Sequence, residues 1–233
     1  MTKIPPRDPR AHIKTDRFKA CPECFRPKDS CICEKVVSFD NKLKVIILQH
    51  PQEQYKQLNS ARLANMALLN SKLLVGLSWP NFKIVAGSEE QPSKWGILYL
   101  KGNSDKSKPC QVFGRNKKEM ENPSELRGII ALDGSWKQAK TLWWRNPWFL
   151  KLNRITLNPE HPSLRSQTKI EGLSTIEAVA LALRCLGEKE EISVSLREQY
   201  ERLIVKKPGV DKKTLSAARI LDPSYRNDGC SLE

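Results

Sequence analysis

Four of the seven cysteines lie close together near the amino terminus, in the pattern C-x2-C-x6-C-x-C. They are Cys21, Cys24, Cys31 and Cys33. Two close pairs of thiols can wrap a tetrahedral Zn²⁺, and a site with four protein ligands leaves no open position for catalysis. The pattern therefore predicts a structural zinc site in residues 19–36. An iron–sulfur cluster and unligated, redox-active thiols are the alternative interpretations.

The segment Leu132-Asp133-Gly134-Ser135-Trp136 places a carboxylate and an indole around a turn that follows an apolar run. A buried strand would deliver Asp133 to the edge of a sheet, where a carboxylate can act as a general base. The simpler interpretation is that Asp133 caps the next helix, and the two roles can coexist. Trp136 can stack on a base or on adenine, or it can pack in the core.

A third segment, Ser174-Thr175-Ile176-Glu177, has the composition of a helix capping box. Free backbone N–H groups at such a helix start can also attract an anion, so a carboxylate of a ligand is a second interpretation. His50 and His161 each flank a proline without a ligand-like partner, and we expect structural roles for both. The remaining cysteines, Cys110, Cys185 and Cys230, are expected to stand alone.

Apolar runs alternating with helical patterns indicate which elements position these residues. Strands are predicted at residues 43–49, 96–100, 129–133 and 154–157, and helices at 59–74, 135–144, 174–186 and 192–206. Strands that are apolar throughout and alternate with helices are typical of a mostly parallel sheet covered on both faces, which is an α/β fold. In such sheets, ligands bind where loops leave the carboxyl ends of the strands.

The overall charge favours a polyanionic partner. Forty Lys and Arg against twenty-six Asp and Glu give a net charge of +14, and phosphate contacts release condensed counterions. A basic but otherwise ordinary surface is the alternative. No apolar run approaches the length of a membrane span, and the amino terminus lacks an apolar signal core. The composition thus predicts a cytoplasmic protein that binds nucleic acid and has no membrane partner; its oligomeric state is open, with a monomer slightly favoured.

The motifs together carry a resemblance to a known family. The segment DGSW resembles the D-x-T-W signature of the DTW-domain family of tRNA-uridine aminocarboxypropyltransferases, with Ser135 in place of Thr. His50-Pro51 followed by Asn59-Ser60-Ala61-Arg62 resembles the family's H-P…N-T-G-R, with Ser for Thr and Ala for Gly. Residues 171–178, EGLSTIEA, are similar to E-G-L-S-T-x-E-A, and the cysteine pattern is similar to the one before the domain in bacterial members. The tail after Ile192 matches less clearly.

This resemblance implies a SPOUT-like fold with a trefoil knot, which the sequence pattern alone would not suggest. Composition and the cysteine pattern predict an arm at 1–18 and the zinc-binding segment at 19–36, and the resemblance makes 37–233 the catalytic domain. The resemblance further implies transfer of the aminocarboxypropyl group of S-adenosylmethionine to N3 of a uridine in tRNA, with methylthioadenosine as by-product. A SPOUT methyltransferase, transfer of the same group to ribosomal RNA and a non-catalytic zinc-ribbon RNA-binding protein are the alternatives.

On this basis we expect Asp133 to be the catalytic residue. The residues expected to bind the donor are Leu100, Leu132, Gly134, Ser135, Trp136, Leu157, Leu173, Ser174 and Thr175. The basic residues in or beside the motifs are expected to hold the tRNA backbone: Arg62, Lys137, Lys140, Arg145, Arg165 and Lys169.

Overall fold

The structure is a computed structural model that describes residues 20–56, 58–99, 105, 107–164 and 172–205. The chain divides into two compact units, residues 1–36 and 37–233. Each unit is described by itself below. The first holds the cysteine cluster, and the second holds the sheet and its helices.

A six-stranded sheet with the order β2-β1-β5-β3-β6-β4 is the centre of the described part of the second unit. Its strands are β1 (Lys44–Gln49), β2 (Ser71–Val75), β3 (Trp95–Tyr99), β4 (Cys110–Phe113), β5 (Gly128–Asp133) and β6 (Asn153–Leu157). All neighbouring pairs are parallel except β4 with β6, which is antiparallel. The prediction of a mostly parallel sheet in an α/β fold is confirmed.

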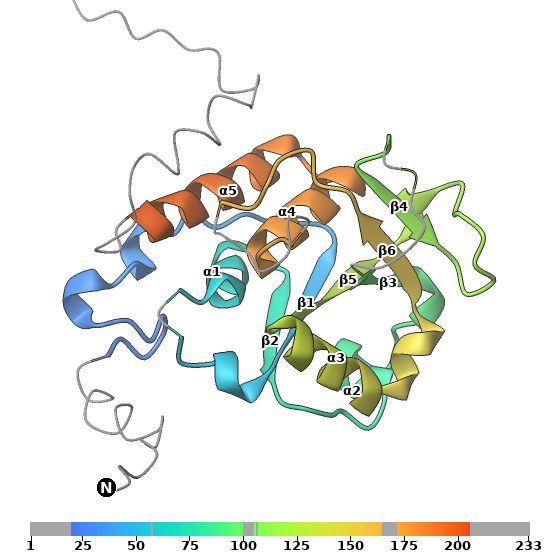
Figure 1. Cartoon of the computed structure of the whole chain (residues 1–233), viewed down its shortest axis with the longest axis horizontal. Coiled ribbons are helices and arrows are strands. Elements are labelled where there is room, and N and C mark those ends of the chain that lie inside the picture. The colour runs from blue at the N-terminus through green and yellow to red at the C-terminus, as the bar shows by residue number, and fades with distance from the viewer. Residues whose placement is uncertain (1–19, 57, 100–104, 106, 165–171, 206–233) are drawn as a thin grey trace, which may run out of the picture. The chain divides into compact units, whose positions relative to one another are not determined.

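Helices cover both faces of this sheet (Figure 1). Helices α1 (Ser60–Ala67), α4 (Thr175–Cys185) and α5 (Glu190–Val205) pack together on one side, and α2 (Phe82–Ala86) and α3 (Trp136–Arg145) lie on the other. Short 3-10 turns join the elements, among them η4 (Pro51–Glu53) after β1 and η7 (Pro147–Lys151) after α3. None of the helices that the structure describes is long and apolar enough to cross a bilayer.

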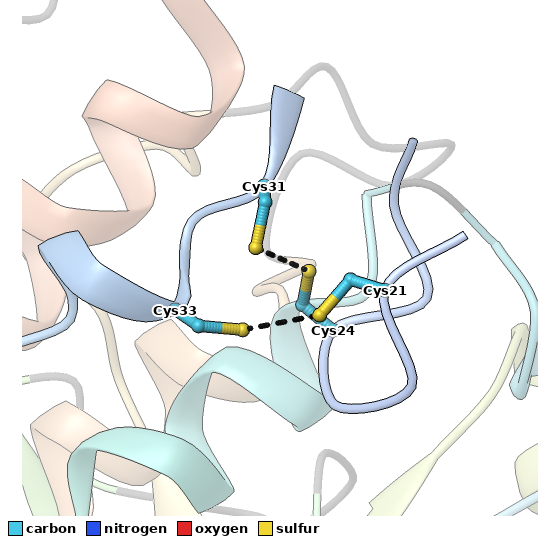
Figure 2. Close-up of side chains that lie close together, drawn as sticks. All are labelled: Cys21, Cys24, Cys31 and Cys33. Carbon is cyan, nitrogen blue, oxygen red and sulfur yellow. Dashed lines mark hydrogen bonds between the residues drawn. The ribbon is translucent and has the colours of Figure 1, made fainter. Parts of the chain in front are cut away.

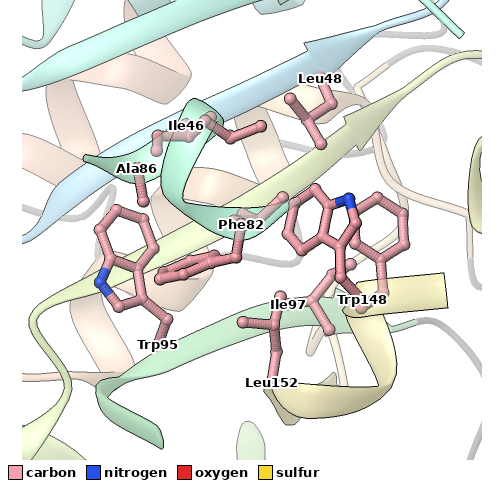
Figure 3. Packing of buried hydrophobic residues seen from close by; sticks show 11 residues of the cluster. Ile46, Leu48, Phe82, Ala86, Trp95, Ile97, Trp148 and Leu152 are labelled. Carbon is pink, nitrogen blue, oxygen red and sulfur yellow. The ribbon is translucent and has the colours of Figure 1, made fainter. Parts of the chain in front are cut away.

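An aromatic core fills the space between the sheet and the α2 side (Figure 3). Phe82 lies 5.5 Å from Trp95 and 5.9 Å from Trp148, measured between ring centroids. Ile46 and Leu48 of β1 belong to this cluster, while the equally buried Val45 and Ile47 point to the opposite face, as alternation along a strand requires. Burying each such side chain is worth about 1.5–3 kcal/mol, so both faces of β1 contribute to stability.

One predicted element is wrong. The helix expected at 59–74 ends at Ala67, and residues 71–75 form strand β2, which pairs with β1. The Ser71 hydroxyl donates to the carbonyl of Leu68 at 2.6 Å and closes the turn between them. A short apolar run fits a helix or a buried strand equally well by periodicity. Here residues 71–75 pair with β1 and form a strand at the edge of the sheet.

Two further differences concern segments after β2. Helix α2 and the antiparallel strand β4 were not predicted, because both are short and carry weak patterns.

Cys110 in β4 and Cys185 at the end of α4 do not stand alone. A hydrogen bond between their thiols raises the pKa of Cys110 and lowers that of Cys185. The expectation for Cys230 lies outside the described residues.

Candidate functional site

Asp133 is the last residue of β5 and lies beside Gln49, the last residue of the neighbouring strand β1. Both side chains are buried, with 8% of Asp133 and none of Gln49 exposed. Because β1 and β5 are parallel, their carboxyl ends meet at one edge of the sheet. The backbone fixes this edge further, since the N–H of His50 donates to the carbonyl of Asp133 at 2.9 Å.

Each carboxylate oxygen of Asp133 accepts a hydrogen bond from a different element. Oδ2 accepts from Nε2 of Gln49 at 2.8 Å, and Oδ1 accepts from the hydroxyl of Thr175 at 2.5 Å. Thr175 is the first residue of α4. The carboxylate therefore joins β1, β5 and α4 at one point.

Asn59 extends this network to α1. Its Oδ1 accepts from Nε2 of Gln49 at 3.1 Å and from the backbone N–H of Arg62 at 2.9 Å, so Asn59 caps α1. Its Nδ2 donates to the carbonyls of Glu53 and Gln54. The helix cap and the carboxylate thus share one amide, that of Gln49.

The environment of Asp133 changes its proton affinity. Burial raises the pKa of the carboxyl group above its usual value, because the charged form loses its hydration. Hydrogen bonds from Thr175 and Gln49 act in the opposite direction, as does Lys56, while nearby Glu53 adds to the rise. A raised pKa makes this carboxylate a stronger base than an exposed aspartate.

The turn after Asp133 is built around Ser135. Ser135 is the N-cap of α3, and its backbone N–H donates to Oε1 of Gln138 at 2.6 Å in a capping box. The interpretation of Asp133 as the cap of this helix is therefore wrong. A side chain at Gly134 would lie 2.8 Å from Cβ of Gln138, so the tight turn excludes one. Asp133 keeps both oxygens for the network described above.

The tryptophans of this region have different environments. Trp136 at the start of α3 is half-buried, so both interpretations of it stay predictions. Trp148 is 6% exposed, and Trp143 contacts Tyr99 and Phe149, so both serve packing. Trp144 is 74% exposed.

The segment before α4 is held by a buried carboxylate, Glu177. Its oxygens accept from the N–H and the hydroxyl of Ser174, from the hydroxyl of Ser163 at 2.6 Å and from the N–H of Leu164 at 2.7 Å. The predicted capping box is confirmed. The Ser174 hydroxyl is engaged by Glu177 and that of Thr175 by Asp133, and binding of an anion at this helix start stays a prediction.

The structure brings together Asp133 and Thr175 among the predicted site residues. Leu132, next to the last residue of β5, and Leu157, the last residue of β6, lie at the same edge of the sheet. Lys137, Lys140 and Arg145 are exposed on α3, and Arg62 is half-buried on α1. Leu100, Arg165 and Lys169 lie outside the described residues.

Sequence reasoning missed Gln49 as a member of the site, and it identified Asn59 from a motif without its link to Gln49. Gln49 is the one polar residue that ends an otherwise apolar run, Val45-Ile46-Ile47-Leu48. That contrast is a usable signal, because a polar side chain at the buried carboxyl end of a strand needs a partner. His50 accepts a hydrogen bond from the N–H of Gln52 through Nδ1, in keeping with the structural role expected for it.

The four amino-terminal cysteines converge on one point (Figure 2). Their sulfur atoms all lie within 4.8 Å of one another, with Cys21 3.5 Å from Cys33 and Cys24 3.7 Å from Cys31. Tetrahedral coordination with metal–sulfur bonds of about 2.3 Å separates the sulfurs by roughly 3.8 Å, so the arrangement can hold a metal ion. Backbone N–H groups of Cys24 and Glu23 lower the pKa of Cys21 to about 6, which favours the thiolate.

Comparison with known proteins identifies the family. The model of the DTW domain matches residues 18–207. The chain belongs to the DTW domain family. No solved structure matches it.

Several curated relatives carry similar names. The chain is 26% identical over 188 residues to tRNA-uridine aminocarboxypropyltransferase 2 of Drosophila melanogaster, covering 78% of this chain and 72% of the fly protein. It is 26% identical over 193 residues to the Macaca fascicularis protein of that name, covering 80% and 63%. It is 29% identical over 136 residues to tRNA-uridine aminocarboxypropyltransferase A of Arabidopsis thaliana, covering 54% and 50%.

Because the Asp133 carboxyl group is buried, the stability of the protein should depend on pH. A carboxyl group whose pKa is raised by folding adds stability below its unfolded pKa, and this is lost as the pH rises through the folded pKa. Asp133→Asn removes the buried charge, and the amide can accept from Gln49 while donating to Thr175. The melting temperature of Asp133→Asn should equal or exceed that of the wild type at pH 8, and the difference should shrink toward pH 4.

Differential scanning fluorimetry from pH 4 to 9 measures this difference. Each kcal/mol of change in the free energy of unfolding should shift the melting temperature by roughly 2–4 °C in a domain of this size. Asp105→Asn is the matched control, because Asp105 is exposed and its pKa is shifted in the opposite direction. A hydrogen bond from the Ser107 hydroxyl lowers it. A lower melting temperature for Asp133→Asn at every pH would mean that the charge itself holds the fold together.

Proposed function

We propose that the protein is a tRNA-uridine aminocarboxypropyltransferase. It transfers the 3-amino-3-carboxypropyl group of S-adenosylmethionine to N3 of a uridine in tRNA and releases 5′-methylthioadenosine. One observation carries the proposal: three separate segments with family-like motifs meet in one hydrogen-bond network, through Asn59, Asp133 and Thr175. The family match and the names of the relatives support the same reaction.

The reaction needs a base and a precise alignment. Uridine N3 gives up its proton and forms a bond to the methylene carbon next to sulfur, while the carbon–sulfur bond breaks and its electron pair stays on sulfur. Asp133 accepts the proton, and its raised pKa suits this task. Its negative charge also favours the sulfonium of the donor. Alignment of the methylene rather than the methyl group is a matter of placement, which can be worth about 7–11 kcal/mol.

The donor lies at the carboxyl edge of the sheet in this proposal. Its site is lined by Leu132 and Leu157 near the carboxyl ends of β5 and β6, by the turn from Gly134 to Trp136, and by the segment Leu173 to Thr175, together with Leu100. Parallel α/β sheets bind their ligands at this edge. The hydroxyls of Ser174 and Thr175 already bind Glu177 and Asp133, so the contribution of this segment to donor binding comes from its backbone.

The fold is proposed to be SPOUT-like, with a trefoil knot. Strand β5 is inserted between β1 and β3, which both precede it in the chain. After β6, the chain returns across the sheet, because Thr175 at the start of α4 binds Asp133 of β5. An insertion followed by such a return is the kind of path that a knot requires.

Helix α3 is proposed to contact tRNA. Lys137, Lys140 and Trp144 are exposed and have the spacing i, i+3 and i+7, which places them on one face of the helix. Arg145 is exposed next to them. Lysines can neutralise phosphates, and an exposed indole can stack on an unpaired base for about 1–3 kcal/mol. Arg62, Arg165 and Lys169 complete the proposed RNA-binding set, and tRNA as substrate is consistent with a cytoplasmic protein.

Zinc is the metal proposed for the cysteine cluster. Four thiolates in a compact site suit structural Zn²⁺, and they leave no ligand position for a substrate. The ion would therefore stabilise residues 19–36 and would take no part in group transfer.

The proposed reaction is tested with purified protein, S-adenosylmethionine labelled in the aminocarboxypropyl arm, and total tRNA. We expect labelled tRNA, release of methylthioadenosine and a uridine of increased mass in nucleoside mass spectrometry. Asp133→Asn should lower kcat by about 10²–10⁴-fold and change donor affinity much less, because general-base catalysis contributes that much. S-adenosylhomocysteine as product would identify a methyltransferase, and RNA binding without donor consumption would identify a non-catalytic binding protein.

Metal content tests the cysteine site. We expect about one zinc ion per chain by plasma mass spectrometry, because the four sulfurs fit one tetrahedral ion. Cys24→Ser should lose the metal and expose residues 19–36 to proteolysis, whereas the control Cys110→Ser should keep it. Iron with acid-labile sulfide, or a wild-type chain without metal, would contradict the zinc assignment.

Helix α3 is tested by tRNA binding at several salt concentrations. Lys137→Ala and Lys140→Ala should each weaken binding and reduce the slope of log K against log salt by about 1, because each removes a phosphate contact. Trp144→Ala should weaken binding without changing the slope, since stacking involves no counterion. Lys189→Ala, an exposed lysine just before α5, is the control. An unchanged slope in both lysine variants would exclude this face from the tRNA contact.

A further inference from the structure

Asp133 is poorly placed to take a proton from a substrate directly. It is 8% exposed, and each of its oxygens already accepts a hydrogen bond from a protein side chain. Thr175, whose hydroxyl donates to Oδ1, is a half-buried residue, whereas Asp133 is buried. The Thr175 oxygen can still accept a hydrogen bond while it donates to Oδ1, so a substrate N–H can join the network there without displacing either donor of Asp133.

Backbone contacts fix the direction of the hydrogen bonds on the other side of Asp133. Two carbonyls, those of Glu53 and Gln54, accept from Nδ2 of Asn59, so the Oδ1 of Asn59 must be its acceptor. Oδ1 of Asn59 also accepts the backbone N–H of Arg62. The group of Gln49 that faces Asn59 is therefore the donor Nε2.

The same Nε2 of Gln49 faces Oδ2 of Asp133, so this carboxylate oxygen is held as an acceptor. A proton on Asp133 is consequently best placed on Oδ1, where the partner is a hydroxyl. A hydroxyl can donate in one state and accept in the other, whereas the Gln49 amide cannot reverse without placing an oxygen against Asn59. The network thus has one adjustable partner, Thr175.

The orientation of Gln49 is maintained at a cost. Its Oε1 is buried and has no hydrogen-bond partner among the residues that the structure describes. An unsatisfied buried acceptor is unfavourable. The opposite orientation would be worse, because it would set Oε1 against acceptors on both Asn59 and Asp133 and leave Nε2 unpaired.

We propose that Thr175 is a proton relay between the substrate and Asp133, with Gln49 and Asn59 as positioning residues. The inference rests on the proposed function and adds the proton's path to it. As uridine N3 bonds to the methylene carbon, its proton moves to the Thr175 oxygen and the original hydroxyl proton of Thr175 moves to Oδ1 of Asp133. The carbon–sulfur bond breaks with its electron pair on sulfur. Thr175 is neutral before and after the step, and Asp133 ends protonated.

Two other charged groups act on this carboxylate. Glu53 in η4 raises its pKa and Lys56, which follows η4, lowers it. These two side chains form an ion pair of 2.6 Å, so they largely offset each other. The hydrogen bonds from Thr175 and Gln49 are then the contacts through which substitutions can shift the pH profile.

Thr175→Val is the central test, because valine keeps the shape of threonine and removes the hydroxyl. We expect kcat for methylthioadenosine release to fall at least about 100-fold, the lower range for loss of proton transfer, with donor and tRNA dissociation constants within about threefold of the wild type. Thr175→Ser restores the hydroxyl and should return kcat to within about tenfold of the wild type. Thr141→Val is the matched control, because it removes a hydroxyl that donates to the Lys137 carbonyl within α3.

A proton inventory provides a readout that a structural role would not change. Single-turnover rates in mixtures of H2O and D2O should give a curved plot for the wild type and Thr175→Ser, because two protons move together, and a straight line for the residual activity of Thr175→Val. Gln49→Met removes a hydrogen bond that lowers the pKa of Asp133, so the acid limb of its kcat profile should shift to higher pH.

The outcomes separate the two proposals. If the wild type transfers the group and Thr175→Val keeps more than about a third of its kcat, or loses donor affinity in proportion to kcat, the relay is wrong and the proposed function is unaffected. A straight proton inventory for the wild type would overturn the relay in the same way. A folded wild type that releases no methylthioadenosine with any tRNA overturns both proposals.

Discussion

The buried carboxylate of Asp133 is the interaction on which the arrangement of this unit depends. A charge removed from water is unfavourable unless each of its acceptor sites receives a donor, and here the donors come from β1 and α4. Asp133 therefore requires that the end of β1 and the start of α4 be brought to the end of β5. The positions of Gln49 and Thr175 follow from that requirement, as does the cap of α1, because Gln49 is shared with Asn59.

The strand order explains why residues so far apart in sequence can meet these demands. Insertion of β5 between β1 and β3 places Asp133 directly opposite Gln49 in the parallel register. The core beneath keeps that register, since a slip by one residue would turn Ile46 and Leu48 away from the aromatic cluster. Glu177 then holds residues 163 and 164 against the start of α4, so the helix presents Thr175 from a supported position.

Sequence reasoning predicted what depends on local pattern and missed what depends on pairing across the sheet. The strands β1, β3 and β5 carry apolar runs, β6 alternates polar residues with Ile155 and Leu157, and the capping box at Ser174 is a local contact. These elements were predicted correctly. Strand β2 was assigned to a helix because only its pairing with β1 distinguishes the two. Gln49 was missed for the same reason, since its partners are 10 and 84 residues away. Asp133 and Thr175 were each predicted as site residues, but the hydrogen bond between them was not.

The chain's charge raises a separate question, because a carboxylate at the reacting centre repels the phosphates of a tRNA. Burial resolves this conflict. The Asp133 carboxylate is buried and accepts hydrogen bonds from neutral donors, and the nearby charges of Lys56 and Glu53 form an ion pair. The exposed lysines of α3 begin at Lys137, four residues further along the chain. Phosphates at the surface interact with the positive field through water, and a net charge of +14 favours their approach over distances near the Debye length of about 10 Å. A sulfonium brought to the carboxyl edge of the sheet would instead meet the carboxylate at short range, where the local charge dominates. One chain can thus attract a polyanion and stabilise a cation, because the two charges act at different depths.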